Sequence, residues 1–266
     1  MNDYGDVWKK SDVSFWDGMW NAHKGSPMTE SCIEEALKVN RLLEVGAGAG
    51  HMLRELFTRG WGKGKGAQYQ GFEIGGAANS AMGKWIAEKA RVGRLEMPIC
   101  DLIGLDFVRY VAEMDPYGVY PADLCLARGV VQHHAHWSIL PRVALRFVPR
   151  VILGIGYSTE RTDRHTGGWQ KKGCYDVRVS PELLKVEAQA MGMHVDRCEI
   201  MMRGARRELF VALTREKPVA PKLKAPSTCY ACGEPVDAHI DGNAPGIVWV
   251  DGIGEVDPCR KMTRGK

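Results

Sequence analysis

The segment from Leu42 to Gly50 constrains the fold of this chain most strongly. A short apolar run ends at a turn with glycine at three alternate positions, Gly46, Gly48 and Gly50, and a helical pattern follows. Glycine adopts positive φ angles and lets the backbone approach a ligand closely. A helix that begins behind such a turn offers unpaired N–H groups and the positive end of its dipole. The segment therefore predicts a strand–turn–helix unit that binds a ligand.

Around this segment, short apolar runs alternate with helical patterns from about residue 40 to residue 214. Strands that alternate with helices favour βαβ units, and therefore an α/β fold with a doubly wound, mostly parallel sheet. The last two expected strands, 193–202 and 206–214, have no helix between them, which predicts an antiparallel hairpin at one sheet edge. The earlier expected strands are 41–45, 69–74, 94–100, 121–129 and 150–156.

The composition excludes several classes of protein. With 45% hydrophobic residues among 266, the chain is too apolar for an intrinsically disordered protein. It has no apolar run of about 18 residues, so no membrane-spanning helix is expected. Its N-terminal sequence lacks the apolar core of a secretory signal, which favours a cytoplasmic location. A net charge of +4 permits a polyanionic partner without requiring one.

Three kinds of nucleotide-binding turn compete for the glycine segment. A phosphate-binding loop needs Gly-Lys-Ser/Thr, whereas His51 and Met52 follow the glycines here. A dinucleotide fingerprint needs a glycine at its sixth position, which is His51. The remaining pattern is apolar-apolar-acidic-apolar-Gly-x-Gly-x-Gly, which the segment matches at every position. In this it resembles the class I S-adenosylmethionine (SAM)-dependent methyltransferases, whose fold is a Rossmann-like α/β sheet with an antiparallel last strand.

The resemblance implies a set of cofactor-binding residues. An acid at the end of the second strand holds both ribose hydroxyls, and Glu73 has that place; a carboxylate accepts two such donors well. Asp101, at the expected end of the third strand, would accept from the adenine amino group, with backbone polarity from Leu102. Glu44 would lie beneath the methionine moiety and orient the turn. The methionine end would be lined by Gly46, Gly48 and Gly50, and Arg128 is also assigned to the cofactor.

Methyl transfer requires a positioned nucleophile and, only when its proton has a high pKa, a base. The loop after the fourth strand reads RGVVQHHAHW and lies where ligands bind in open α/β sheets. His133 matches the family's loop histidine and His134 is adjacent, so these two are the candidate bases. The alternative is that they pack or cap the following helix. A metal site made with His136 is disfavoured because no carboxylate lies nearby.

The sequence also bears on the methyl acceptor. The Asn/Asp-Pro-Pro-aromatic signature of DNA amino-methyltransferases and the Pro-Cys pair of cytosine-C5 enzymes are absent after the fourth strand, which favours a small-molecule acceptor. Before the first strand, Trp16, Trp20 and His23 either line the active site as a lid or belong to an amphipathic helix packed on the sheet. The basic insertion 161–178 either binds an anionic substrate or nucleic acid, or is a solvated loop.

The cysteines form two groups. Cys229 and Cys232 form a Cys-x2-Cys knuckle which, with His239 and Cys259, could hold a structural zinc ion. This segment also weakly resembles a degenerate, non-cleaving HNH module, because Gly252 stands where that module has its histidine. The other five cysteines are expected to be reduced and mostly buried: Cys32, Cys100, Cys125, Cys174 and Cys198.

We therefore expect a SAM-dependent methyltransferase with an unidentified acceptor. The alternatives are a nucleic-acid-modifying methyltransferase guided by the basic loop and the knuckle, and a non-catalytic SAM-fold binding module. The sequence leaves the oligomeric state open. The expected organisation is a lid or helical segment at 1–40, the methyltransferase domain at 41–214, a linker at 215–228 and a zinc-knuckle module at 229–266.

Overall fold

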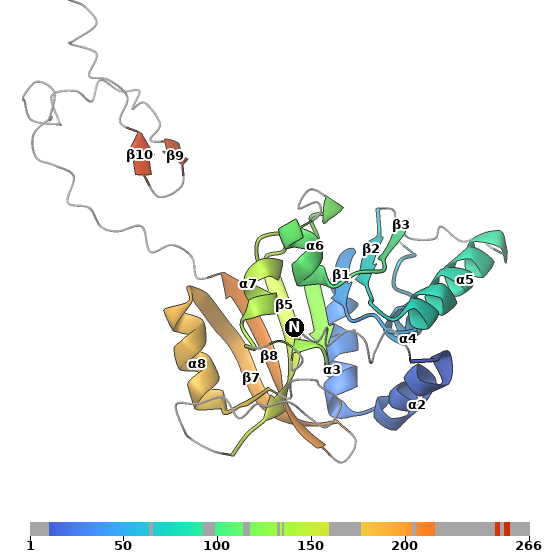
Figure 1. The fold of residues 1–266 in the computed structure, drawn as a ribbon, viewed down its shortest axis with the longest axis horizontal. Helices are drawn as coiled ribbons and strands as arrows, with labels where there is room; N and C mark the ends of the chain where they lie inside the picture. The colour runs from blue at the N-terminus through green and yellow to red at the C-terminus, as the bar shows by residue number, and fades with distance from the viewer. Residues whose placement is uncertain are drawn as a thin grey trace, which may run out of the picture. The chain divides into compact units, whose positions relative to one another are not determined.

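A computed structural model describes most of the first 215 residues and two short strands near the C-terminus (Figure 1). The chain divides into two compact units, residues 1–216 and 217–266. In the second unit the described residues form one antiparallel hairpin, β9 (Val248–Val250) with β10 (Ile253–Glu255). The described residues are 11–63, 66–92, 99–113, 118–131, 134, 136–159, 177–203, 206–215, 248–250 and 253–255.

The first unit is built on one eight-stranded sheet with the strand order β3-β2-β1-β4-β5-β8-β7, to which β6 adds by pairing with β5. Strands β1 to β5 pair in parallel, β8 is antiparallel to β5, and β7 is antiparallel to β8. This confirms the predicted doubly wound sheet. The bounds are β1 Arg41–Val45, β2 Gln68–Phe72, β3 Ile99–Ile103, β4 Leu124–Arg128, β5 Arg150–Tyr157, β6 Arg178–Val179, β7 Met193–Arg203 and β8 Arg206–Arg215.

Alternate residues of the central strands send their side chains to opposite faces of the sheet, where two apolar clusters form. Leu42 and Leu124 belong to the cluster with α3, α4 and α5, whereas Leu43 and Cys125 belong to the cluster with α6, α7 and α8. Among the described residues no helix is long and apolar enough to cross a membrane. The helices are α2 Val13–His23, α3 Pro27–Ala36, α4 His51–Thr58, α5 Gly76–Val92, α6 Phe107–Glu113, α7 Ile139–Ala144 and α8 Pro181–Ala190.

The predicted antiparallel hairpin is confirmed, but only one of its strands lies at the sheet edge. β8 is inserted between β5 and β7, so β7 is the edge strand. Residues Glu208 to Leu213 of β8 are all buried, as expected for a strand covered on both faces. β7 carries exposed Ile200 and Met202 and contains a register shift between Val195 and Arg197. The continuous apolar run of β8 therefore explains why this strand lies inside the sheet, between β5 and β7.

Candidate functional site

A cavity of about 120 Å³ opens at the carboxyl ends of β1 and β4. These neighbouring strands flank the point where the strand order reverses, which is where open α/β sheets bind ligands. Its walls come from α2, from the turn after β1, from the residues that follow β2 and β3, and from the end of β4. The site therefore brings together segments that are far apart in the sequence.

The glycine turn after β1 has the backbone that the sequence predicted. Gly46, Gly48 and Gly50 have φ angles of 75°, 55° and 79°. A Cβ atom at Gly46 would lie 1.9 Å from Cγ2 of Val130, and one at Gly50 would lie 2.6 Å from Cγ of Met82. Gly46 and Gly48 line the cavity, whereas Gly50 forms the N-cap of α4. Both the backbone conformation and the packing thus require glycine.

Glu73 follows β2 directly and ties that strand end to the glycine turn. Its side chain lines the cavity and is almost fully buried. One carboxylate oxygen accepts from the N–H of Gly48 at 2.7 Å and the other from the N–H of Gly75 at 2.7 Å. Burial raises the pKa of Glu73, while the hydrogen bonds from Gly75 and Gly48 oppose that rise. Each oxygen keeps further acceptor capacity for a hydroxyl in the cavity.

Glu44 lines the same cavity and is buried. Burial raises the pKa of Glu44 to about 7, against the opposing effects of a hydrogen bond from Tyr69 and of the Arg128 charge. The Tyr69 hydroxyl donates to Oε2 of Glu44 at 2.6 Å. It reaches Glu44 across Gly71, where a Cβ atom would lie 3.0 Å from the hydroxyl. Sequence reasoning missed Tyr69, although the Tyr-x-Gly spacing within a strand was a usable signal.

The structure corrects the expected place of Asp101. β3 continues to Ile103, so Asp101 lies in the middle of the strand, where its carboxylate accepts from the side-chain amide of Gln70 at 3.1 Å. Neither Asp101 nor Leu102 lines the cavity; Leu102 packs against the apolar cluster beneath it. The sequence predicted this strand at residues 94–100, whereas β3 spans Ile99–Ile103, so Asp101 was wrongly placed at the strand end. The acid after β3 that lines the cavity is Asp106, which caps α6 by accepting from the N–H of Arg109 at 2.9 Å.

Arg128 ends β4 and lines the cavity. Its guanidinium lies over the ring of Trp20, 5.2 Å from the centroid, and donates to the Thr29 hydroxyl at 2.5 Å. Thr29 and Trp20 belong to the N-terminal helices α3 and α2, so Arg128 connects the sheet to both helices.

Helix α2 covers the cavity. Trp16, Trp20 and His23, the three residues considered for a lid, all line it. His51 at the start of α4 holds this helix, because its Nε2 lies 2.7 Å from Oδ1 of Asp17 and its ring stacks on Trp20 with centroids 5.6 Å apart. Burial lowers the pKa of His51, whereas the hydrogen bond and charge of Asp17 raise it.

The two candidate bases are placed differently. His133 lies outside the described residues. His134 is buried and does not line the cavity, and its backbone N–H donates to the carbonyl of Val131 at 3.2 Å. His136 faces away toward α7 and α8, with its Nδ1 2.8 Å from the Ser138 hydroxyl and its Nε2 3.9 Å from the carboxylate of Glu187. Base catalysis by His133 or His134 stays a prediction.

The predicted zinc ligands Cys229, Cys232, His239 and Cys259 lie outside the described residues, as does nearly all of the basic insertion 161–178. Within the part of the chain that the structure describes, no group of three metal-ligating side chains comes together. The zinc site therefore stays a prediction.

No protein-family model matches this chain, and no curated protein sequence matches it significantly. Solved structures do match. Magnesium protoporphyrin IX methyltransferase from Synechocystis PCC 6803, with bound SAM, matches at a TM-score of 0.54 and 11% identity, over 81% of this chain and 98% of that one. A 1,6-didemethyltoxoflavin-N1-methyltransferase from Burkholderia thailandensis matches at a TM-score of 0.54 and 15% identity, over 77% of this chain and 84% of that one. The glycopeptide N-methyltransferase MtfA matches at a TM-score of 0.51 and 14% identity, over 72% of this chain and 96% of that one.

These matches are too distant in sequence to show more than the fold. Together with the strand order and the glycine turn, they show that the described part of residues 11–215 has the fold of the class I SAM-dependent methyltransferases.

Proposed function

We propose that this protein is a SAM-dependent methyltransferase that acts on a small-molecule acceptor. The observation that carries the proposal is the bond from Gly48 N–H to Glu73, which joins the glycine turn to the one buried acid that follows β2. A ribose diol beside this pair would meet a carboxylate that is already held in place. The neighbouring structures with bound SAM or S-adenosylhomocysteine support the choice of cofactor.

The residues present fit this cofactor. At Gly46 and Gly48, which line the cavity, an added Cβ atom would lie 1.9 Å from Val130 and 3.2 Å from Trp16, so the turn requires glycine. Glu73 would hold the ribose, and Asp106 with Ile74 would border the adenine. The cavity of about 120 Å³ is smaller than the roughly 300 Å³ or more of typical ligand pockets. Trp16 and Trp20 of α2 line this space.

When bound, SAM supplies an electrophilic methyl group on a positively charged sulfur. The contribution of the chain is to position the acceptor in line with that methyl group and to exclude water. Trp16, Met19 and Trp20 form an apolar wall suited to both tasks. For an acceptor whose proton has a high pKa, His133 or His134 would remove it. Replacing each with alanine and measuring turnover and cofactor affinity separately tests that role.

Glu73→Gln tests the cofactor site because the amide cannot accept from two hydroxyls as a carboxylate does. We expect affinity for S-adenosylhomocysteine, measured by calorimetry, to fall about tenfold or more, since hydrogen bonds to charged groups contribute about 1.5–3 kcal/mol. Glu113→Gln, which changes an exposed acid on α6, is the control and should bind normally. Unchanged binding by Glu73→Gln would contradict the proposed site.

The acceptor class needs its own experiment. We expect labelled methyl groups from SAM to enter the small-molecule fraction of a host extract rather than the protein or nucleic acid fractions. Label in nucleic acid would favour the alternative modifying enzyme, and tight cofactor binding without any transfer would favour a non-catalytic binding module.

We also propose a structural zinc ion held by Cys229, Cys232, His239 and Cys259, on the basis of ligand chemistry in the sequence alone. Metal analysis of the purified full chain should find about one equivalent of zinc, and a Cys229→Ser/Cys232→Ser variant should lose it.

A further inference from the structure

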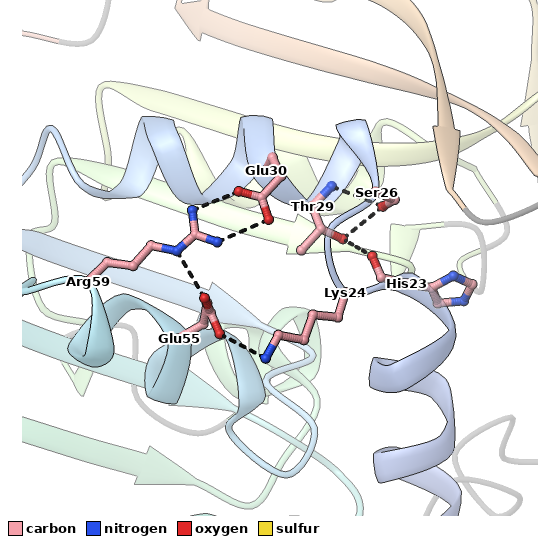
Figure 2. Close-up of polar contacts among 7 residues, drawn as sticks. All are labelled: His23, Lys24, Ser26, Thr29, Glu30, Glu55 and Arg59. Carbon is pink, nitrogen blue, oxygen red and sulfur yellow. Dashed lines mark hydrogen bonds and ion pairs between the residues drawn. The ribbon is translucent and has the colours of Figure 1, made fainter.

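The hydroxyl of Thr29 connects three segments at the edge of the cavity. Thr29 is fully buried, and its hydroxyl donates to the carbonyl of His23 at 2.9 Å (Figure 2). It accepts from the guanidinium of Arg128 at 2.5 Å, and the Ser26 hydroxyl lies 3.1 Å away. Because a hydroxyl has one hydrogen, Ser26 is the donor in that contact. One donor and two acceptor positions are thereby all in use.

The start of α3, which carries Thr29, is firmly anchored to α4 (Figure 2). Glu30 binds the guanidinium of Arg59 through both oxygens, at 2.7 and 3.0 Å. Arg59 also donates to Glu55 at 3.0 Å, and the ammonium of Lys24 lies 3.6 Å from the same carboxylate. A bidentate pair fixes geometry as well as charge. These contacts keep Thr29 in a fixed position, so its hydroxyl can hold the flexible side chain of Arg128.

The surroundings of Arg128 allow its guanidinium to reach Thr29. The residue beside Arg128 on the neighbouring strand is Gly154. A Cβ atom there would lie only 3.3 Å from Cγ of Arg128, so glycine leaves room for the aliphatic part of the arginine side chain. At its other end the guanidinium lies between Thr29 and the ring of Trp20. A bond to a fixed hydroxyl restricts the rotamers of a side chain that is otherwise flexible.

The register of the sheet places Arg128 beside the glycine turn. Ala127 pairs with Val45, so the residues that follow them, Arg128 at the end of β4 and Gly46 in the turn, lie side by side. A planar guanidinium matches a carboxylate better than any other side chain does. The amino-acid carboxylate of the methyl donor or of its product is such a group.

We propose that Thr29 is a positioning residue which holds the Arg128 guanidinium and the end of α2 in the arrangement that binds the amino-acid carboxylate of the cofactor. The inference rests on the proposed function. It assigns no contact with the cofactor to Thr29 itself, which acts through Arg128.

Two ligands and three variants test this role by calorimetry. S-adenosylhomocysteine carries the carboxylate, whereas 5′-methylthioadenosine lacks the amino-acid part. We expect Thr29→Val to bind S-adenosylhomocysteine about tenfold more weakly and 5′-methylthioadenosine within about twofold of the wild-type chain, because one charge-assisted bond is lost. Thr29→Ser keeps the hydroxyl and should restore the affinity. Arg128→Gln should show the same selective loss as Thr29→Val, without altering the core around α3.

Thr58→Val is the matched control, because the Thr58 hydroxyl also donates to a backbone carbonyl, that of Arg54 at 2.9 Å, on the exposed side of α4. Equal weakening of both ligands in Thr29→Val would mean a merely structural role and would overturn the inference. So would unchanged binding of S-adenosylhomocysteine in Thr29→Val or in Arg128→Gln. A wild-type chain that binds neither ligand would instead overturn the proposed function, and the inference with it.

Discussion

The hydroxyl of Tyr69 lies 2.6 Å from Oε2 of Glu44, and both side chains are buried beneath the glycine turn. Tyr69 keeps its proton, because burial and the nearby Glu44 carboxylate raise its pKa well above 10. It is therefore a permanent donor to Glu44. Burial raises the pKa of Glu44 to about 7.

This relationship predicts how stability depends on pH. The unfolded carboxyl ionises near 4.5 and the folded one near 7, so between these values the folded state binds more protons. The contribution of Glu44 to the free energy of unfolding therefore falls as the pH rises from about 4.5 to about 7, by roughly 3 kcal/mol in total. Chemical denaturation of the wild-type chain and of Glu44→Gln across this range should show the difference. Parallel curves for the two proteins would contradict the raised pKa.

The glycine turn predicts a graded cost of adding a methyl group. Gly46→Ala should lower the free energy of unfolding by about 3 kcal/mol, because it combines a positive φ with a clash against Val130. Gly25→Ala is the matched control, since Gly25 has a φ of 73° but nothing within 4 Å of an added Cβ atom. It should cost only about 1–2 kcal/mol. If thermal or chemical denaturation showed equal losses of stability in the two variants, the side chain of Val130 would be able to move aside without a cost in free energy.

The two aspartates near β3 can be separated by substitution. Asp106→Asn should weaken binding of S-adenosylhomocysteine about tenfold, since an amide replaces a charged acceptor beside the cavity. Asparagine caps helices about as well as aspartate, so α6 should persist. Asp101→Asn should leave the affinity unchanged, because Asp101 pairs with Gln70 within the sheet. The opposite result in calorimetry would restore the assignment made from the sequence.

The contact between Asp17 and His51 predicts a change that a titration can detect. Asp17→Asn should lower the pKa of His51 further, because it removes the hydrogen bond and charge that now oppose the effect of burial. Nuclear magnetic resonance titration of the His51 ring measures this directly. Asp12→Asn, which alters the N-cap of the same helix, should leave the pKa of His51 unchanged. A similar shift in both variants would mean that the charge of the helix, rather than the contact, is responsible.

Much of the fold follows from local patterns in the chain. The strand at Arg41–Val45 and the hairpin of β7 and β8 agree with the expected bounds to within a residue or two. Here the apolar periodicity and the Gly and Pro signals are read directly from neighbouring residues. Glu44, Gly46, Gly48 and Glu73 line the cavity for the same reason, since each lies at or just beyond the end of a recognisable strand.

Other features depend on partners that are distant in the sequence. β3 continues past Asp101 because Gln70 and its neighbours on β2 pair with it, so the cavity receives Asp106 instead. Tyr69 reaches Glu44 only where β1 and β2 lie side by side, and Thr29 meets Arg128 across 99 residues of chain. The sequence alone thus determined which segments form strands and where the glycine turn lies, because those signals are local. The tertiary structure decided which side chains hold the turn and its neighbours in place, because strand register and helix packing bring those partners together.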